Sequence, residues 1–178
     1  DGTKLATLPL SRESPLDLSS RLDDTASRLS KLTLSSPIDL ASREQEIRRL
    51  QFHMIAVQEE LDWRVYGIQR LLEEELCAPS LDSLPEVRPG ERAFEIALAR
   101  RQAAGEVKTK WFARHGSTPT TEIPNHWPED YRALVERRLN AMEENKSIRL
   151  IERPEYKRRW NTESFQKRLE RSCRDWLL

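Results

Sequence analysis

The stretch SREQEIRRLQFHMIAVQEELDWRVYGIQRLLEEEL, residues 42–76, decides the fold that the sequence predicts. It opens with Ser42-Arg43-Glu44-Gln45, a capping box in which the hydroxyl and the amide satisfy exposed backbone N–H groups at a helix start. Apolar residues then recur at alternating steps of three and four positions, interrupted at Arg64 and Val65. We therefore expect one long, coiled-coil-like helix that ends near Leu76. Its seam residues are Ile47, Leu50, Met54, Val57, Leu61, Ile68 and Leu72.

A second helical stripe precedes this stretch. Ser14-Pro15 is a helix start, because Ser can cap the helix and Pro suits its first position. Ser35-Ser36-Pro37 ends the helix, since the residue before Pro is pushed out of the helical region. A short connection of this kind predicts that the two helices fold back on each other. Residues 1–78 are therefore predicted to form an antiparallel helical hairpin or arm. The stripe consists of Leu18, Leu22, Ala26, Leu29 and Leu32.

The remaining chain predicts a small, irregular helical domain. Residues 79–90 contain Pro79, Pro85, Pro89 and Gly90 and are predicted to be a linker. Residues 91–178 then form the C-terminal domain, and the expected fold class is mainly all-α. We expect helices at 91–104, with Gly105 as the stop, near 108–114, from Pro128 onward, around 156–160, and after a cap at Asn161-Thr162. A short extended piece is expected at 148–151.

Charge and composition exclude several classes of protein. The 178 residues contain 30 basic and 30 acidic side chains, so no overall field attracts nucleic acid or an anionic membrane. Cys77 and Cys173 are too few for a disulfide framework and fit a reducing cytoplasm. No apolar run approaches the roughly 20 residues of a membrane helix, and no signal peptide is visible, so no membrane partner is expected. The start at Asp1-Gly2 suggests a piece of a longer protein.

Catalytic signatures are absent from the sequence. His53, His115 and His126 match no zinc-ligand spacing, and no nucleophile elbow, triad pattern or phosphate-binding loop is present. We therefore expect no catalytic residue, no metal site and no cofactor site in this chain. The carboxylates Glu59-Glu60 and those at 73–75 are interpreted as a solvent-exposed helical face. Tryptophans beside turns, at positions 111, 127 and 160, are expected to fix loops to the core through their indole rings.

The C-terminal end carries the candidate binding residues. Residues 146–178 hold ten basic and five acidic side chains, and the basic ones interleave with aromatic residues. Such a composition can hold phosphates and stack on bases. The competing interpretation is a solvated helical face with Trp160 and Trp176 in the core. The candidate nucleic-acid-binding residues are Lys157, Arg158, Arg159, Lys167, Arg168, Arg171 and Arg174.

Five sequence motifs resemble segments of a known protein family. WFARHGSTP (111–119), PNHWPEDYRALVERR (124–138) and RPEYKRRW (153–160) are similar to the C-terminal region of large adenine-specific DNA methyltransferases. These enzymes belong to phage growth limitation systems, the BREX type 2 group of bacterial antiphage defence. QEELDWRVYG (58–67) and RAFEIALAR (92–100) also resemble segments of such enzymes downstream of the catalytic domain.

The resemblance implies a role without catalysis. The family's chemistry depends on a glycine motif for S-adenosylmethionine and an Asn-Pro-Pro-Tyr word for the target adenine, and this chain has neither. S-adenosylmethionine is thus implied only for the parent protein. The chain is expected to brace DNA recognition, or to dock the parent's own domains or another defence protein. The alternative is a helical protein-interaction module without nucleic-acid contact, which self-associates through residues 42–76.

Overall fold

The computed structural model describes residues 13–32, 40–160 and 163–177. The described residues form helices and loops without a strand, which confirms the all-α prediction. The predicted helix end at Ser35-Ser36-Pro37 and the predicted cap at Asn161-Thr162 lie outside the described residues, as does the side chain of Trp176. The elements are α2 (Leu16–Lys31), α3 (Leu40–Ile68), η2 (Leu81–Ser83), α4 (Ala93–Ala103), α5 (Trp111–His115), α6 (Glu129–Glu144), α7 (Lys146–Ile151), η3 (Pro154–Tyr156) and α8 (Phe165–Leu177).

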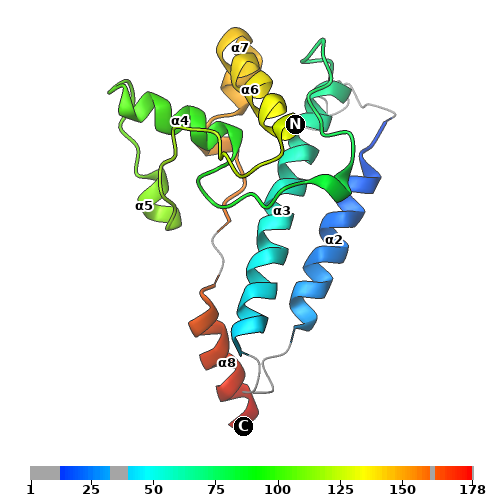
Figure 1. Cartoon of the computed structure of the whole chain (residues 1–178), viewed down its shortest axis with the longest axis vertical. Coiled ribbons are helices and arrows are strands. Elements are labelled where there is room, and N and C mark those ends of the chain that lie inside the picture. Colours follow the sequence, from blue (N-terminus) through cyan, green and yellow to red (C-terminus); the bar gives the residue numbers. More distant parts are fainter. Residues whose placement is uncertain (1–12, 33–39, 161–162, 178) are drawn as a thin grey trace, which may run out of the picture.

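Helices α2 and α3 form the predicted antiparallel arm, and they lie side by side in Figure 1. The seam is apolar: Leu18 of α2 and Ile47 and Leu50 of α3 are buried. Leu22, Ala26 and Leu29 of α2 are partly buried and pack against the core. This spacing places one side chain per helical turn in the interface, which is why the periodicity predicted the pair.

The long helix ends earlier than predicted. Helix α3 stops at Ile68 rather than near Leu76 because the chain forms a Schellman turn. The Leu71 N–H donates to the Tyr66 carbonyl at 2.9 Å, and the Arg70 N–H donates to the Gly67 carbonyl at 2.8 Å. Arg70 takes the left-handed position with φ 55°, a place usually held by glycine. Because no glycine occupies this position, the sequence pattern did not indicate where the helix ends.

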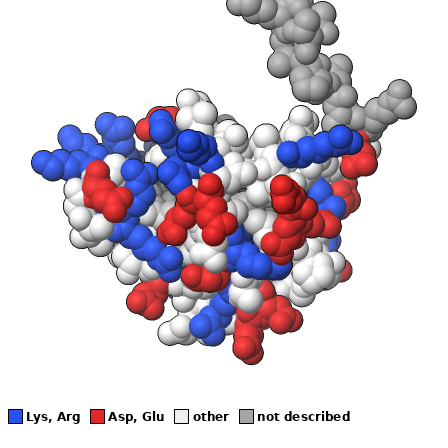
Figure 2. All heavy atoms as spheres, turned by 90° about the horizontal axis from the view of Figure 1, so that it is seen from above, with Lys and Arg blue, Asp and Glu red and all other residues white. Residues whose placement is uncertain are grey.

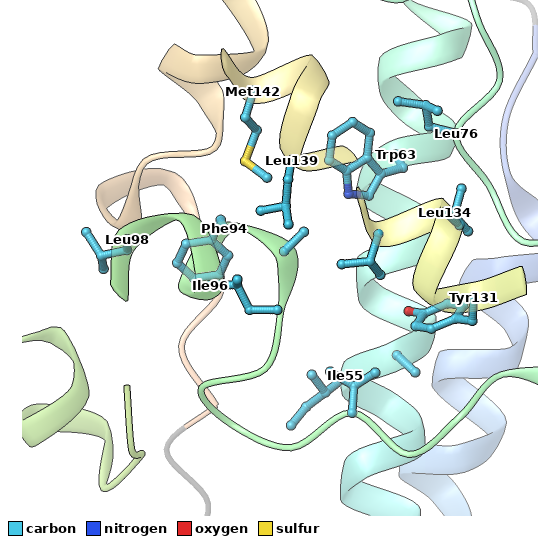
Figure 3. Close-up of a cluster of buried hydrophobic side chains, with 14 of the residues drawn as sticks. Ile55, Trp63, Leu76, Phe94, Ile96, Leu98, Tyr131, Leu134, Leu139 and Met142 are labelled. Atoms are coloured by element: carbon cyan, nitrogen blue, oxygen red, sulfur yellow. The ribbon is translucent and has the colours of Figure 1, made fainter. Parts of the chain in front are cut away.

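Helices α4 to α7 gather around the upper part of α3, whereas α8 lies at its lower end (Figure 1). One buried cluster joins Ile55 and Trp63 of α3 to Phe94 of α4 and to Tyr131 and Leu139 of α6 (Figure 3). This end of the molecule is called the globular end below. It contains α4 to α7 and the second half of α3, so α3 runs through both the arm and the globular end.

Two segments of the C-terminal half differ from expectation. Residues 148–151, expected to be extended, lie in α7 because the Asn145 side chain caps that helix. Asn145 Oδ1 accepts hydrogen bonds from the backbone N–H groups of Ser147 at 2.9 Å and Ile148 at 3.2 Å. The helix expected around 156–160 is only the short η3, which starts at Pro154. Helices α4, α6 and α8 match their predicted positions, and Gly105 follows α4 with φ 77°.

Candidate nucleic-acid interface and the buried charges behind it

The face of α3 toward the globular end carries charge into the core. Glu59 and Glu60 were interpreted as solvent-exposed, and this was wrong: their exposed fractions are 2% and 1%. Burial raises the pKa of Glu59, but the positive charges of Lys157, Arg138 and Arg92 outweigh it, and the net pKa lies below 4.5. Glu59 therefore stays ionised inside the protein and accepts a hydrogen bond from the Trp63 indole N–H at 3.2 Å.

Glu60 forms a buried ion pair with Arg138 of α6. The guanidinium lies 2.8 Å from Glu60 Oε1 and also donates to the Leu76 carbonyl at 3.0 and 2.9 Å. The Ala78 backbone N–H donates to the second Glu60 oxygen at 2.7 Å. Arg138 also lies 5.3 Å from the centre of the Trp63 ring. This pair therefore connects α3, α6 and the loop after α3, three segments that are distant in sequence.

A second buried pair organises the start of α4. Arg92 and Glu95 lie 2.9 Å apart with exposed fractions of about 4% and 1%. Glu95 accepts hydrogen bonds from the Trp111 indole N–H at 2.9 Å and from the Gly90 backbone N–H at 2.8 Å. Arg92 donates to the Arg158 carbonyl at 2.9 Å. The pair thus fixes α5 and the segment after η3 to α4, and the Trp111 contact confirms the expected anchoring role of that indole.

Lys157, the first predicted nucleic-acid contact, lies inside this region. Its exposed fraction is 6%, and its ammonium is 2.7 Å from both Glu152 Oε1 and Asp62 Oδ2. The Tyr66 hydroxyl donates to the same Glu152 oxygen at 2.6 Å. Burial lowers the pKa of Lys157, but Glu152, Glu59 and Asp62 raise it well above its usual value. The charge of Lys157 is therefore balanced within the protein, and its ammonium does not lie on the surface.

Three of the remaining predicted cations have internal partners. Arg168 of α8 is partly buried and donates to the Leu29 carbonyl at 2.6 Å and the Leu32 carbonyl at 3.3 Å. The positive charge of Arg168 interacts favourably with the negative, C-terminal end of the α2 dipole. Its hydrogen bonds hold α8 at that end of the arm. Arg171 pairs with Glu163 at 3.0 Å on the surface. Arg158 is exposed and lies 4.6 Å from the centre of the Trp160 ring.

The other three predicted cations are exposed. Arg159, Lys167 and Arg174 have no ion pair or side-chain hydrogen bond among the described residues. Lys167 and Arg174 belong to α8, which lies at the lower end of Figure 1, away from the globular end. These side chains are the part of the predicted set that can meet a phosphate without breaking an internal contact.

The described metal-ligating and thiol side chains do not form a recognisable reactive site. The described residues contain no group of three His, Cys, Asp or Glu side chains arranged to hold a metal ion. Burial and the nearby Glu60 raise the pKa of the Cys77 thiol to about 11, which keeps it protonated near neutral pH. Cys77 and Cys173 are both free thiols. Among the described helices, none is long and apolar enough to cross a membrane.

Comparisons with known proteins identify a matching family and a related methyltransferase. The family described as Domain of unknown function (DUF7008) matches residues 54–178. The chain is also 46% identical over 188 aligned residues to the adenine-specific methyltransferase PglX of Streptomyces coelicolor. That alignment covers 99% of this chain but 16% of the relative, in its C-terminal part. The family match starts within α3, whereas the match to the relative includes the arm. No solved structure matches.

Proposed function

Because the chain belongs to the family described as Domain of unknown function (DUF7008), we propose that it is a non-catalytic accessory domain of an adenine-specific DNA methyltransferase. The observation that carries the proposal is the match of nearly the whole chain to the C-terminal part of such an enzyme. The chain spans about 16% of that relative's length, and the proposal assigns the methylation chemistry to the remaining part of such an enzyme.

The residues present do not fit S-adenosylmethionine. The described residues contain no strand, so they lack the turn from strand to helix at which glycine-rich motifs hold nucleotide cofactors. Each of the buried carboxylates Glu59, Glu60, Glu95 and Glu152 has at least one oxygen that accepts a hydrogen bond from an arginine, lysine, indole or backbone N–H group. We therefore assign no step of methyl transfer to this chain.

Within the parent enzyme, the proposed role is to brace and orient DNA engagement. Helix α3 supports this role because it spans 29 residues and belongs to both the arm and the globular end. Ion pairs fix its second half, and α8 is held at the far end of the arm through Arg168. Exposed cations on α8 would then face phosphates at a defined distance from the globular end.

A binding assay on duplex DNA tests this role. We expect changing Arg159, Lys167 and Arg174 together to Ala to weaken duplex binding and to flatten its salt dependence. Each lost phosphate contact should reduce the slope of log K against log salt by about 0.9. The control changes Arg70, Arg88 and Arg114 to Ala, three exposed cations outside the predicted binding set, so that the same charge is removed. Equal binding by both triple variants, or no binding by the unmodified chain, would refute the proposal.

The second candidate function is docking to another protein without nucleic-acid contact. Self-association through the α3 seam would have to displace α2, because Ile47 and Leu50 are already buried in the arm. Docking to the preceding part of the parent, or to another protein of a defence system, needs no such change. Light scattering of the unmodified chain and of Leu61→Asp tests self-association, since a monomer at all concentrations in both samples contradicts it.

A further inference from the structure

A cleft at the globular end is lined by arginines that the sequence did not single out. It has a volume of about 530 Å³ and lies among α4, α6, α7 and the start of η3. Phe94, Leu98, Leu139 and Met142 contribute its apolar part, and they approach one another in Figure 3. The arginines that line it are Arg100, Arg101, Arg149 and Arg153.

The hydrogen bonds of these arginines leave most of their charge unbalanced. Arg100 donates through Nε to the Thr121 carbonyl at 2.9 Å. Arg149 donates to the Met142 carbonyl at 3.1 Å and to the Glu143 carbonyl. A carbonyl oxygen orients a guanidinium but does not neutralise it. The side chain of Arg153 is exposed and has no hydrogen-bond or ion-pair partner among the described residues.

Among the described residues that line the cleft, one carboxylate has no ion-pair partner. Glu106 lies 3.4 Å from Arg101, and Glu152 is balanced by Lys157. Glu143 alone remains, against Arg100, Arg149 and Arg153. Figure 2, which looks onto this end of the molecule, shows Lys and Arg gathered toward the side where α4 and α5 lie in Figure 1. The cleft therefore favours an anionic ligand.

An exposed aromatic residue, Tyr156, closely follows the cleft-lining residues Arg153 and Pro154 in the sequence. Tyr156 is 67% exposed, and its backbone N–H donates to the Arg153 carbonyl at 3.0 Å, so the two residues are neighbours. Leu150 of α7 is also exposed. Tyrosine usually buries most of its ring, and exposed aromatic rings combined with basic side chains are the means by which proteins stack on unpaired bases and hold their phosphates.

We propose that this cleft and Tyr156 bind unpaired DNA nucleotides, with phosphates on Arg149 and Arg153 and a base stacked on Tyr156. This goes beyond the proposed function, which needs only phosphate contacts at Arg159, Lys167 and Arg174. A duplex hides the faces of its bases within the stack, whereas an unpaired strand presents them. The surface therefore distinguishes a single strand from a duplex, which the cations of α8 do not.

The test compares one oligonucleotide in two forms. A fluorescent single-stranded 12-mer and the duplex of the same sequence are titrated with the chain, and inorganic phosphate and AMP are added as competitors. The variants are Tyr156→Ala, Tyr156→Phe and Arg153→Ala. Leu16→Ala is the matched control for Tyr156 because Leu16 is 69% exposed on the arm, and Arg88→Ala is the control for Arg153. Thermal melting verifies that every variant is folded.

We expect the single strand to bind more tightly than the duplex. Tyr156→Ala should weaken single-strand binding by about tenfold, while Tyr156→Phe retains it because the ring remains. Arg153→Ala should weaken binding and reduce its salt dependence, and both controls should leave it unchanged. A crosslink from an iodouracil-containing strand should map to the peptide that contains Tyr156.

Several results would overturn the inference. These are equal affinity for the two forms, an unchanged affinity in Tyr156→Ala, or competition by inorganic phosphate as effective as that by AMP. Displacement by polyglutamate together with equal affinity for both forms would identify an acidic protein segment as the occupant. The proposed function fails separately, because it depends on duplex binding by Arg159, Lys167 and Arg174 and not on Tyr156.

Discussion

The arm and the globular end are stabilised by different means, although one helix belongs to both. In the arm, apolar residues such as Leu18, Ile47 and Leu50 are buried while most charges remain in water. At the globular end, charged side chains lie in the core itself. Buried charges there include Glu59, Glu60, Arg92, Glu95, Arg138, Glu152 and Lys157.

The difference shows where a single substitution matters most. A buried ion exchanges favourable hydration for a partner, so removing that partner leaves an uncompensated charge in the interior. An apolar seam loses only the transfer and packing contribution of the atoms removed. The globular end should therefore be the more sensitive region, and the two regions should also respond differently to pH.

The largest effect is expected for Arg138→Met. This change leaves the Glu60 carboxyl in the core without its guanidinium partner and should lower the free energy of unfolding by about 3–5 kcal/mol. Arg137→Met is the matched control, because Arg137 is the adjacent residue and its side chain is half exposed beside Glu74. The control should cost less than about 1 kcal/mol. Urea denaturation measures both, and equal losses would remove the proposed contrast between the regions.

A double variant tests whether Glu60 and Arg138 stabilise the protein through direct interaction with each other. Replacing Glu60 by Leu together with Arg138→Met removes both charges, so the double variant should be more stable than the sum of the single losses predicts. The Ala78 N–H and the Leu76 carbonyl, which now pair with these side chains, would lose their partners, so recovery should be partial. Strict additivity of the two losses would contradict direct coupling between Glu60 and Arg138.

A smaller effect is expected in the arm for Ile47→Val. Ile47 is buried between α2 and α3, and losing one methylene group should cost about 1 kcal/mol. Leu16→Ala removes a larger apolar group from a side chain that is 69% exposed and should change stability little. Thermal and urea denaturation monitored by circular dichroism provide the comparison. A loss as large as that of Arg138→Met would show that the arm is as sensitive as the globular end.

The smallest effect concerns the pH dependence of the arm. Burial first, then the charges of Arg21, Arg28 and Arg49, lower the pKa of His53 below 6.5. The unfolded chain thus binds this proton more readily than the folded one. The contribution of the His53 imidazole to the free energy of unfolding is complete above about pH 6.5. It is lost as the pH falls toward the lowered pKa of His53 in the folded protein. Because His53 is half exposed, its contribution to the free energy of unfolding should be well below about 1 kcal/mol.

Denaturation as a function of pH measures this contribution. His53→Gln should remove the part of the pH dependence between the two pKa values. His126→Gln, which changes an exposed residue outside the arm, should retain it. If His53→Gln left the pH profile of stability unchanged, the positive surroundings of His53 would have no effect on folding.

Much of the fold followed from local patterns. The stripes of α2, α4, α6 and α8 and the seam of α3 repeat with the helical period, so their positions were predictable. The end of α3 was not, because Arg70 rather than glycine takes the left-handed position. Helix α7 was missed because its cap depends on Asn145, whose side chain also donates to the Leu71 carbonyl at 2.8 Å.

The candidate interface was less predictable. Lys157 and Arg159 are near neighbours in one basic run, yet Lys157 lies in the core and Arg159 on the surface. Nothing local distinguishes them, because the carboxylate of Asp62 that receives Lys157 is 95 positions away. The cleft arginines come from three separate segments, so no sequence run displayed them. Tyr156 was expected within a helix, and its exposure follows from the short turn that replaces that helix.

The sequence by itself determined most of the helices, the antiparallel arm and the resemblance to a methyltransferase family, because helical periodicity and short motifs are local properties of the chain. Tertiary structure alone decided which charges lie inside and which remain available for a ligand. The physical reason is that a charged side chain enters the core only where partners from distant segments replace its water. Glu60 and Arg138 meet this condition across 78 positions of sequence.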